Sequence, residues 1–162
     1  MKPYIWVRVD NRLIHGQIIQ AWLPFLNPSV IITVEGDQLP NGIQSTLMRM
    51  AVPKHIDLIF LTSEQLKKSW SIFIHNKNDK TVLVLVKEVK IIYEAVIKGD
   101  FLPDIINLGN IHALDGRIEI TPYIFLSKEE YNMLKEINSK GIKIQLQTLP
   151  TQSPLYFEEI KL

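Results

Sequence analysis

Short apolar runs recur along the chain and alternate with segments of helical periodicity. Five runs rich in valine and isoleucine span residues 4–9, 30–34, 56–62, 81–86 and 104–109. Several are almost continuously apolar, which is typical of strands covered on both faces in a parallel sheet. The pattern therefore predicts repeated βαβ units.

The segments between these runs carry helix signals. Residues 16–26 and 43–52 each place apolar side chains on one helical face: Ile18, Ile19, Trp22 and Leu23 in the first, and Ile43, Leu47, Met50 and Ala51 in the second. Two further helices are predicted, one beginning at Ser63 as N-cap and one ending at Gly99 as C-cap.

The pattern changes after residue 110. Within residues 117–126, polar and apolar positions alternate over 117–121 and Pro122 follows, as expected of a strand or hairpin near a sheet edge. A helix follows, with Ser127 and Glu130 as a capping box and Gly141 as its stop, before an alternating strand over 142–149. We therefore expect one α/β domain over residues 1–162. Its open, mostly parallel sheet has helices on both faces and an edge hairpin or antiparallel strand near the C-terminal part.

Composition narrows the class of protein. The 162 residues are 46% hydrophobic, with 18 basic and 17 acidic side chains and a net charge of +1, so bulk charge favours neither nucleic acid nor an anionic membrane. The absence of cysteine excludes disulfides and thiolate chemistry. The N-terminus lacks a signal-peptide core, and no apolar stretch approaches the roughly 18 residues of a spanning helix, so we expect a cytoplasmic protein.

The candidate catalytic and anion-binding residues lie where the first strand ends, in RVDNRLIHGQ over residues 8–17. His15 lies at the mouth of the predicted helix, where unpaired N–H groups favour anions and keep the imidazole neutral. Arg8 and Arg12 carry guanidinium groups suited to phosphate oxygens. Asp10 either fixes the histidine tautomer or pairs with an arginine to set the loop.

The remaining aromatic and histidine residues indicate no second site. His55, His75 and His112 are widely spaced and lack carboxylates at ligand spacing, so we expect solvated loop residues and no zinc. No GxGxxG follows the first strand, which disfavours a dinucleotide site. The three tryptophans fit packing better than a nucleic-acid stacking platform: Trp6, Trp22 and Trp70.

The segment RVDNRLIHGQIIQAW resembles the phosphorylation segment of IIB components of the mannose/fructose/sorbose family of bacterial sugar phosphotransferase systems, which usually reads close to RIDDRLIHGQV. Weaker similarity extends over the chain. TLMRMAVP resembles the family's second helix, INLGN its strand and glycine turn before the hairpin, and LKEINSKGIKIQLQTLP its last helix and strand. The family's fold agrees with the predicted architecture.

The resemblance implies a phosphoryl relay. His15 would accept phosphate from a phosphohistidine of a IIA partner and pass it to a sugar hydroxyl held by membrane IIC and IID components. By position, Arg12 and Arg8 would contact the phosphoryl group, and four residues would bind it or shape the site: Asp10, Gly16, Gln17 and Asp37. The resemblance implies no cofactor or metal, membrane association only through partners, and possible homo-oligomers.

Some positions depart from the family's usual pattern. Asn11 replaces a common aspartate, and Pro40 and Gly42 stand where an alanine and another aspartate are usual. His112 takes the place of a small or apolar residue, and the sequence gives it no role. These departures leave an alternative open: a regulatory binding module that docks partners without passing phosphate to sugar.

Overall fold

The computed structural model describes residues 2–74 and 80–162. Within them, a central sheet has the strand order β3-β2-β4-β1-β5-β8-β9. Neighbouring strands are parallel except for β9, which runs antiparallel to β8. In that order the strands span Asp57–Leu61, Val30–Val34, Thr81–Val86, Tyr4–Asp10, Ile105–Asn110, Lys143–Leu146 and Leu155–Tyr156.

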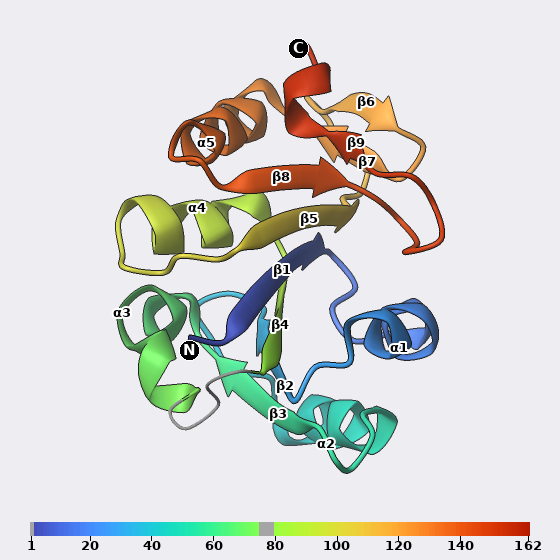
Figure 1. The fold of residues 1–162 in the computed structure, drawn as a ribbon, viewed down its shortest axis with the longest axis vertical. Coiled ribbons are helices and arrows are strands. Elements are labelled where there is room, and N and C mark those ends of the chain that lie inside the picture. The colour runs from blue at the N-terminus through green and yellow to red at the C-terminus, as the bar shows by residue number, and fades with distance from the viewer. Residues whose placement is uncertain (1, 75–79) are drawn as a thin grey trace.

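Helices cover both faces of this sheet (Figure 1). One face carries the π-helical turn η1 (Ile18–Trp22), α1 (Leu23–Leu26) and α2 (Gly42–Ala51). The opposite face carries α3 (Ser63–Phe73), α4 (Val89–Ile97) and α5 (Lys128–Ser139). A short 3-10 turn, η2 (Phe157–Glu159), follows β9. The predicted fold class is confirmed.

Alternation along the strands divides the core between the two faces. In β1, Ile5, Val7 and Val9 pack in the larger cluster with side chains of α3, α4 and α5. Trp6 points to the other face, where it packs with Trp22 and Leu23. The side chains of residues 6, 8 and 10 share this second face because strand residues alternate. The core burial expected for Trp6 and Trp22 is confirmed.

The hairpin near the edge is also confirmed. Strands β6 (Ile118–Thr121) and β7 (Ile124–Leu126) pair antiparallel in a separate two-stranded sheet, with Pro122 in their turn. A parallel bridge between Ile111 and Ile124 joins this hairpin to the end of β5. The hairpin therefore lies at the carboxyl edge of the main sheet.

Helix ends differ in detail from the sequence prediction. The capping box of Ser127 and Glu130 is present, and Gly141 follows with a φ of +84°. Helix α3, however, is capped by Thr62 rather than by Ser63, because the Thr62 hydroxyl accepts from the Gln65 N–H.

The last turn of α4 also corrects a prediction. Its C-cap is Lys98 rather than Gly99. Gly99 serves a different purpose, since a Cβ there would lie only 2.5 Å from the Lys67 carbonyl oxygen. The glycine permits α3 and the end of α4 to approach closely.

Helix α2 forms where expected, but its apolar face points to solvent. Ile43, Leu47 and Met50 are 75%, 62% and 78% exposed. The helix buries no residue fully, and its stability at the N-terminus comes from a capping box between Asn41 and Gln44. Periodicity located the helix correctly, although it did not show which way the face would turn.

The connections define the point at which the strand order reverses. The chain passes from β1 to β2 on the η1 and α1 face, and from β4 to β5 on the α4 face. The carboxyl ends of β1 and β4 therefore flank the crevice where open α/β sheets bind ligands. Within the described residues, no helix combines the length and apolarity needed to cross a membrane.

Candidate functional site

A tight turn at the end of β1 exposes the candidate site. The Leu13 N–H donates to the Asp10 carbonyl over 3.1 Å, and Leu13 adopts a left-handed φ of 56° that is unusual for a branched side chain. Its buried side chain packs in the cluster of Trp22 and holds this conformation. The chain then becomes helical over residues 16–26, so His15 stands immediately before a helix start.

Asp10 lies at the centre of the site, with its side chain fully buried. Its Oδ1 accepts from the backbone N–H and the Nε of Arg12, each over 3.1 Å. Its Oδ2 accepts from Arg8 Nε at 3.3 Å and lies 3.1 Å from His15 Nε2. The two roles considered for Asp10, ordering the histidine and pairing with arginine, therefore occur together.

These partners determine the charge of Asp10. Burial by itself would raise its pKa, but hydrogen bonds from His15 and Arg12 and the charge of Arg8 outweigh burial and lower the pKa from 3.8 to about 2. Asp10 is therefore a carboxylate at neutral pH, held beneath the histidine.

The hydrogen bonds of the His15 ring define its tautomer. Because a carboxylate only accepts hydrogen bonds, the Nε2 facing Asp10 carries the proton. On the other side, the Gln17 backbone N–H donates to Nδ1 over 3.3 Å. Nδ1 therefore carries the lone pair, beside the first amides of the helix. The His15 side chain is 16% exposed, so the ring is half-buried at the surface.

Arg12 and Gln17 complete the rim of the site. The Arg12 Nη2 donates to Asp10 Oδ2 over 3.3 Å and to Gln17 Oε1 over 3.1 Å. The Arg12 side chain remains 37% exposed. Gly16 lies beside them with open space where a Cβ would be. A guanidinium and bare helix-start amides thus flank the imidazole.

Arg8 lies deeper in the protein than Arg12. Its side chain is fully buried, and its guanidinium carbon lies 4.6 Å from the Trp22 ring centroid. Its Nη atoms donate to the carbonyl oxygens of Gln147 and Thr148 over 2.9 and 3.1 Å. They also donate to Asn107 Oδ1 and, over 3.4 Å, to Gln17 Oε1. Arg8 therefore lies beneath Asp10 and joins the site to the end of β8.

Burying this cation disfavours its charged form. Burial lowers the pKa of Arg8 from 12.5 to about 10, although Asp10 opposes the change. The group is still charged at neutral pH, and its charge lies directly below the Asp10 carboxylate.

Gly109 provides the space that Arg8 occupies. A Cβ at position 109 would lie 1.9 Å from Arg8 Cζ and 2.2 Å from an Arg8 Nη. The glycine of INLGN therefore lies inside β5 rather than in a turn after it. Its missing side chain admits the guanidinium between neighbouring strands.

Asp37 lies apart from this cluster. It is exposed in the loop between β2 and α2, and among the described residues no hydrogen bond or ion pair joins it to His15. In the same loop, Glu35 pairs with Lys87 over 3.0 Å, and the Lys87 carbonyl accepts from the Asn11 amide. Lys87 therefore links this loop to the His15 turn.

Several residues of the site were not singled out from the sequence. Three of them bond the Arg8 guanidinium: Asn107 on β5, and Gln147 and Thr148 in the turn after β8. The fourth is Lys87, whose carbonyl accepts from Asn11. Polar residues at the carboxyl ends of predicted buried strands were the available signal, because a buried amide there needs a polar partner.

Among residues 2–74 and 80–162, no group of three histidine or acidic side chains is placed to hold a metal ion. His55 and His112 are exposed, as expected, and His75 lies outside the described residues.

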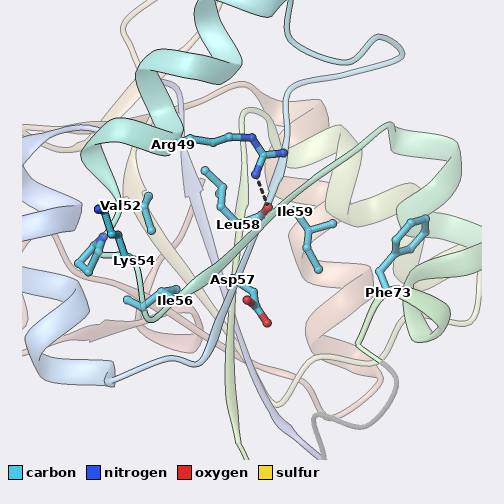
Figure 2. Close-up of a pocket in the computed structure, with 9 residues that line it drawn as sticks. Arg49, Val52, Lys54, Ile56, Asp57, Leu58, Ile59 and Phe73 are labelled. Atoms are coloured by element: carbon cyan, nitrogen blue, oxygen red, sulfur yellow. Dashed lines mark hydrogen bonds between the residues drawn. The ribbon is translucent and has the colours of Figure 1, made fainter.

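A separate hollow lies at the β3 edge of the sheet (Figure 2), where Arg49 donates to the Leu58 carbonyl. It borders the start of β3, so it does not include the His15 turn.

Known proteins resemble the whole chain. A family model described as PTS system sorbose subfamily IIB component matches residues 4–161. An N-acetylgalactosamine-specific phosphotransferase enzyme IIB component 2 from Escherichia coli (strain K12) is 24% identical over 152 residues, covering 94% of each chain. A probable phosphotransferase enzyme IIB component from Streptococcus pyogenes is 27% identical over 165 residues, covering 95% of this chain and 96% of that one.

Solved structures agree with the fold. ManxB from Thermoanaerobacter tengcongensis superposes with a TM-score of 0.81 at 23% identity, covering 96% of this chain and 93% of its own. The IIBSor domain of the sorbose permease from Klebsiella pneumoniae superposes with a TM-score of 0.77 at 22% identity, covering 94% of this chain and 92% of its own.

A sequence relative is longer than this chain. The mannose-specific EIIAB component of Escherichia coli (strain K12) is 21% identical over 91% of this chain and 45% of its own.

Fold and site define an open, doubly wound α/β protein with a histidine, a carboxylate and two arginines at the switch point of its sheet. The chain belongs to the family of phosphotransferase system IIB components of the sorbose subfamily.

Proposed function

We propose that this protein is a phosphocarrier, in which His15 accepts a phosphoryl group from a IIA partner and passes it to a sugar hydroxyl. The observation that carries the proposal is the polarity of the ring, with Nε2–H on Asp10 and the Nδ1 lone pair beside the helix start. Family membership and the name of the EIIAB relative, which joins A and B components, support the assignment of the partner.

The chemistry requires only groups that the chain supplies. The Nδ1 lone pair attacks the phosphorus of the donor phosphohistidine, and the donor P–N bond breaks as the new one forms. Asp10 stabilises the positive charge that develops on the ring, as a carboxylate does for a general-base histidine. Transfer onward breaks the Nδ1–P bond while the sugar hydroxyl forms an O–P bond and releases its proton to water, which leaves the His15 ring neutral with its proton on Nε2. Neither step needs a cofactor.

The surroundings of Nδ1 favour a bound phosphoryl group. In the unphosphorylated protein the Gln17 N–H donates to Nδ1 of His15. When Nδ1 is bonded to phosphorus, the same N–H donates to a phosphoryl oxygen instead. The half-exposed Arg12 guanidinium supplies the direct positive contact. Arg8, being buried, acts through Asp10 and Gln17.

In this proposal the final acceptor of the phosphoryl group is a sugar, without a particular sugar being named. The relatives are named for N-acetylgalactosamine, sorbose, fructose and mannose, so the shared acceptor is a sugar hydroxyl. In this proposal the sugar is held by membrane IIC and IID components. The protein works in the cytoplasm and reaches the membrane through those partners.

Incubation with phosphoenolpyruvate, the general phosphotransferase proteins and a candidate IIA tests the proposal. We expect intact mass to show one acid-labile phosphate on the wild-type protein and none on His15→Ala, because Nδ1 of His15 is the proposed acceptor. The matched control is His55→Ala, which alters a histidine at the opposite end of the sheet. A wild-type protein that stays unphosphorylated with every competent donor would favour the regulatory docking module instead.

Arg12→Lys tests the direct phosphoryl contact. Lysine keeps the charge but loses the planar fork, so we expect phosphoryl transfer to slow or the phosphohistidine lifetime to shorten by about tenfold, with an almost unchanged melting temperature. The readouts are the transfer rate by quench flow and the rate at which the phosphohistidine loses its phosphate at neutral pH. Arg49→Lys is the matched control, since Arg49 lies at the β3 edge (Figure 2). Unchanged transfer and lifetime would reduce Arg12 to an ion-pair partner of Asp10.

A further inference from the structure

Asn11, the residue that follows β1, connects both neighbouring strands of the sheet. Its Nδ2 donates to the carbonyl oxygen of Lys87, just beyond β4, over 2.7 Å. Its Oδ1 accepts from the backbone N–H of His112, just beyond β5, over 2.6 Å. Its own N–H donates to the Asn110 carbonyl over 3.0 Å. One side chain therefore ties the His15 turn to the ends of the two strands that flank β1.

Both attachment points are themselves fixed. On the β4 side, the Lys87 N–H donates to the Val34 carbonyl over 3.1 Å, and Lys87 Nζ pairs with Glu35. The bond from Asn11 therefore ends on backbone that is already anchored to β2.

The attachment on the β5 side is anchored to α5. The His112 carbonyl accepts from Arg117 Nη1 over 2.8 Å. Arg117 also forms a bidentate pair with Glu130 at the start of α5, over 2.9 and 2.6 Å. The segment over residues 112–117 is thus held between the His15 turn and the helix.

The two bonds of Asn11 require an amide. A carboxylate could still accept from the His112 N–H, but it would place a second acceptor against the Lys87 carbonyl. An apolar side chain would lose both bonds and leave the His112 N–H and the Lys87 carbonyl without this partner. In this chain, asparagine therefore satisfies both partners, whereas the aspartate common in the family could serve only the His112 N–H.

We propose that Asn11 is a positioning residue for phosphoryl transfer, holding the His15 turn in register with residues 87 and 112–117. This inference rests on the proposed phosphocarrier function. Asn11 is the direct neighbour of Asp10, whose carboxylate orients the His15 ring, so a shift of Asn11 is transmitted to Nδ1. The same two hydrogen bonds hold residues 87 and 112 against the turn that carries His15.

The test compares Asn11→Ala and Asn11→Asp with the wild-type protein. The matched control is Asn138→Ala, because the Asn138 amide also makes two bonds, to the Ile142 carbonyl and to Glu158, but near the end of α5. Three readouts are needed: kcat and KM for phosphorylation by IIA, amide exchange of His112, and the ¹⁵N shifts of the His15 ring.

For Asn11→Ala we expect kcat to fall about tenfold with KM for IIA changed less than about twofold, because the loss of a hydrogen bond corresponds to roughly one decade. We also expect faster exchange at the His112 amide and a shifted Nδ1 resonance. Asn11→Asp should slow transfer while the His112 amide stays protected. Asn138→Ala should transfer at the wild-type rate.

Wild-type kcat in Asn11→Ala would overturn the inference, as would an equal fall in Asn138→Ala, which would indicate a general loss of stability. Slowing confined to Asn11→Asp would also overturn it, because the cause would be the added charge. An unphosphorylated wild-type protein overturns the proposed function instead. In that case, faster exchange of the His112 amide in Asn11→Ala would still show that Asn11 holds residue 112.

Discussion

Gly109→Ala is expected to destabilise the protein by about 3 kcal/mol and to reduce phosphorylation of His15 severely. The new Cβ would overlap the Arg8 guanidinium, with 1.9 Å to Cζ. The end of an arginine is normally flexible, but this one is buried and bound to Asp10, Asn107 and two carbonyl oxygens. It can move only by breaking bonds on which the Asp10 carboxylate depends.

Urea denaturation measures the loss of stability, and intact-mass phosphorylation measures the loss of function. Gly42→Ala is the matched control, since a Cβ there meets nothing within 4 Å and α2 tolerates alanine. A double-mutant cycle with Arg8→Ala identifies the cause, because the two losses should be far from additive when they share one contact. Additive losses would show that Gly109 acts independently of Arg8.

Asp10→Asn is expected to cost about 3 kcal/mol and to slow phosphoryl transfer roughly a hundredfold or more. The amide preserves the shape of the side chain but leaves the buried Arg8 charge without its carboxylate. It can also present an N–H to His15 Nε2, which would favour the opposite tautomer and protonate Nδ1. Stopped-flow transfer and ¹⁵N spectra of the ring distinguish these effects. Transfer at the wild-type rate with an unchanged tautomer would contradict the proposed role of Asp10.

The Asp10 charge also predicts a pH dependence. The pKa of Asp10 in the folded protein is about 2, and its ordinary value is 3.8. Because Asp10 resists protonation in the folded state, its charge contributes fully to the free energy of unfolding above about pH 4. This contribution is lost as the pH falls toward 2. The shift corresponds to about 2 kcal/mol. The stability difference between wild type and Asp10→Asn should therefore narrow between pH 4 and 2. A constant difference over that range would contradict the charge assignment.

Most of the sheet could be predicted from the sequence because its strands are nearly continuous apolar runs with helical segments between them. The two-residue β9 could not, since Leu155 and Tyr156 are too few to show a period. The orientation of α2 also escaped prediction. Ile43, Leu47 and Met50 form the same stripe whether it faces a core or solvent.

The site was predicted in outline but not in depth. The motif located His15, Asp10 and both arginines at the end of β1. It could not separate a half-exposed Arg12 from a buried Arg8, because the space for Arg8 comes from Gly109, a hundred residues further along the chain. Nor could it show that Asn11 bonds residues 87 and 112, since such long-range partners exist only after the strands align.

The outward face of α2 has a consequence for how this sequence can change over generations. Ile43, Leu47 and Met50 contribute little to the core, so substitutions there are almost neutral for folding. The buried network around Arg8 and Asp10, by contrast, tolerates few replacements. Selection can therefore remodel the surface of α2 to suit a new binding partner while the chemistry at the end of β1 stays constant.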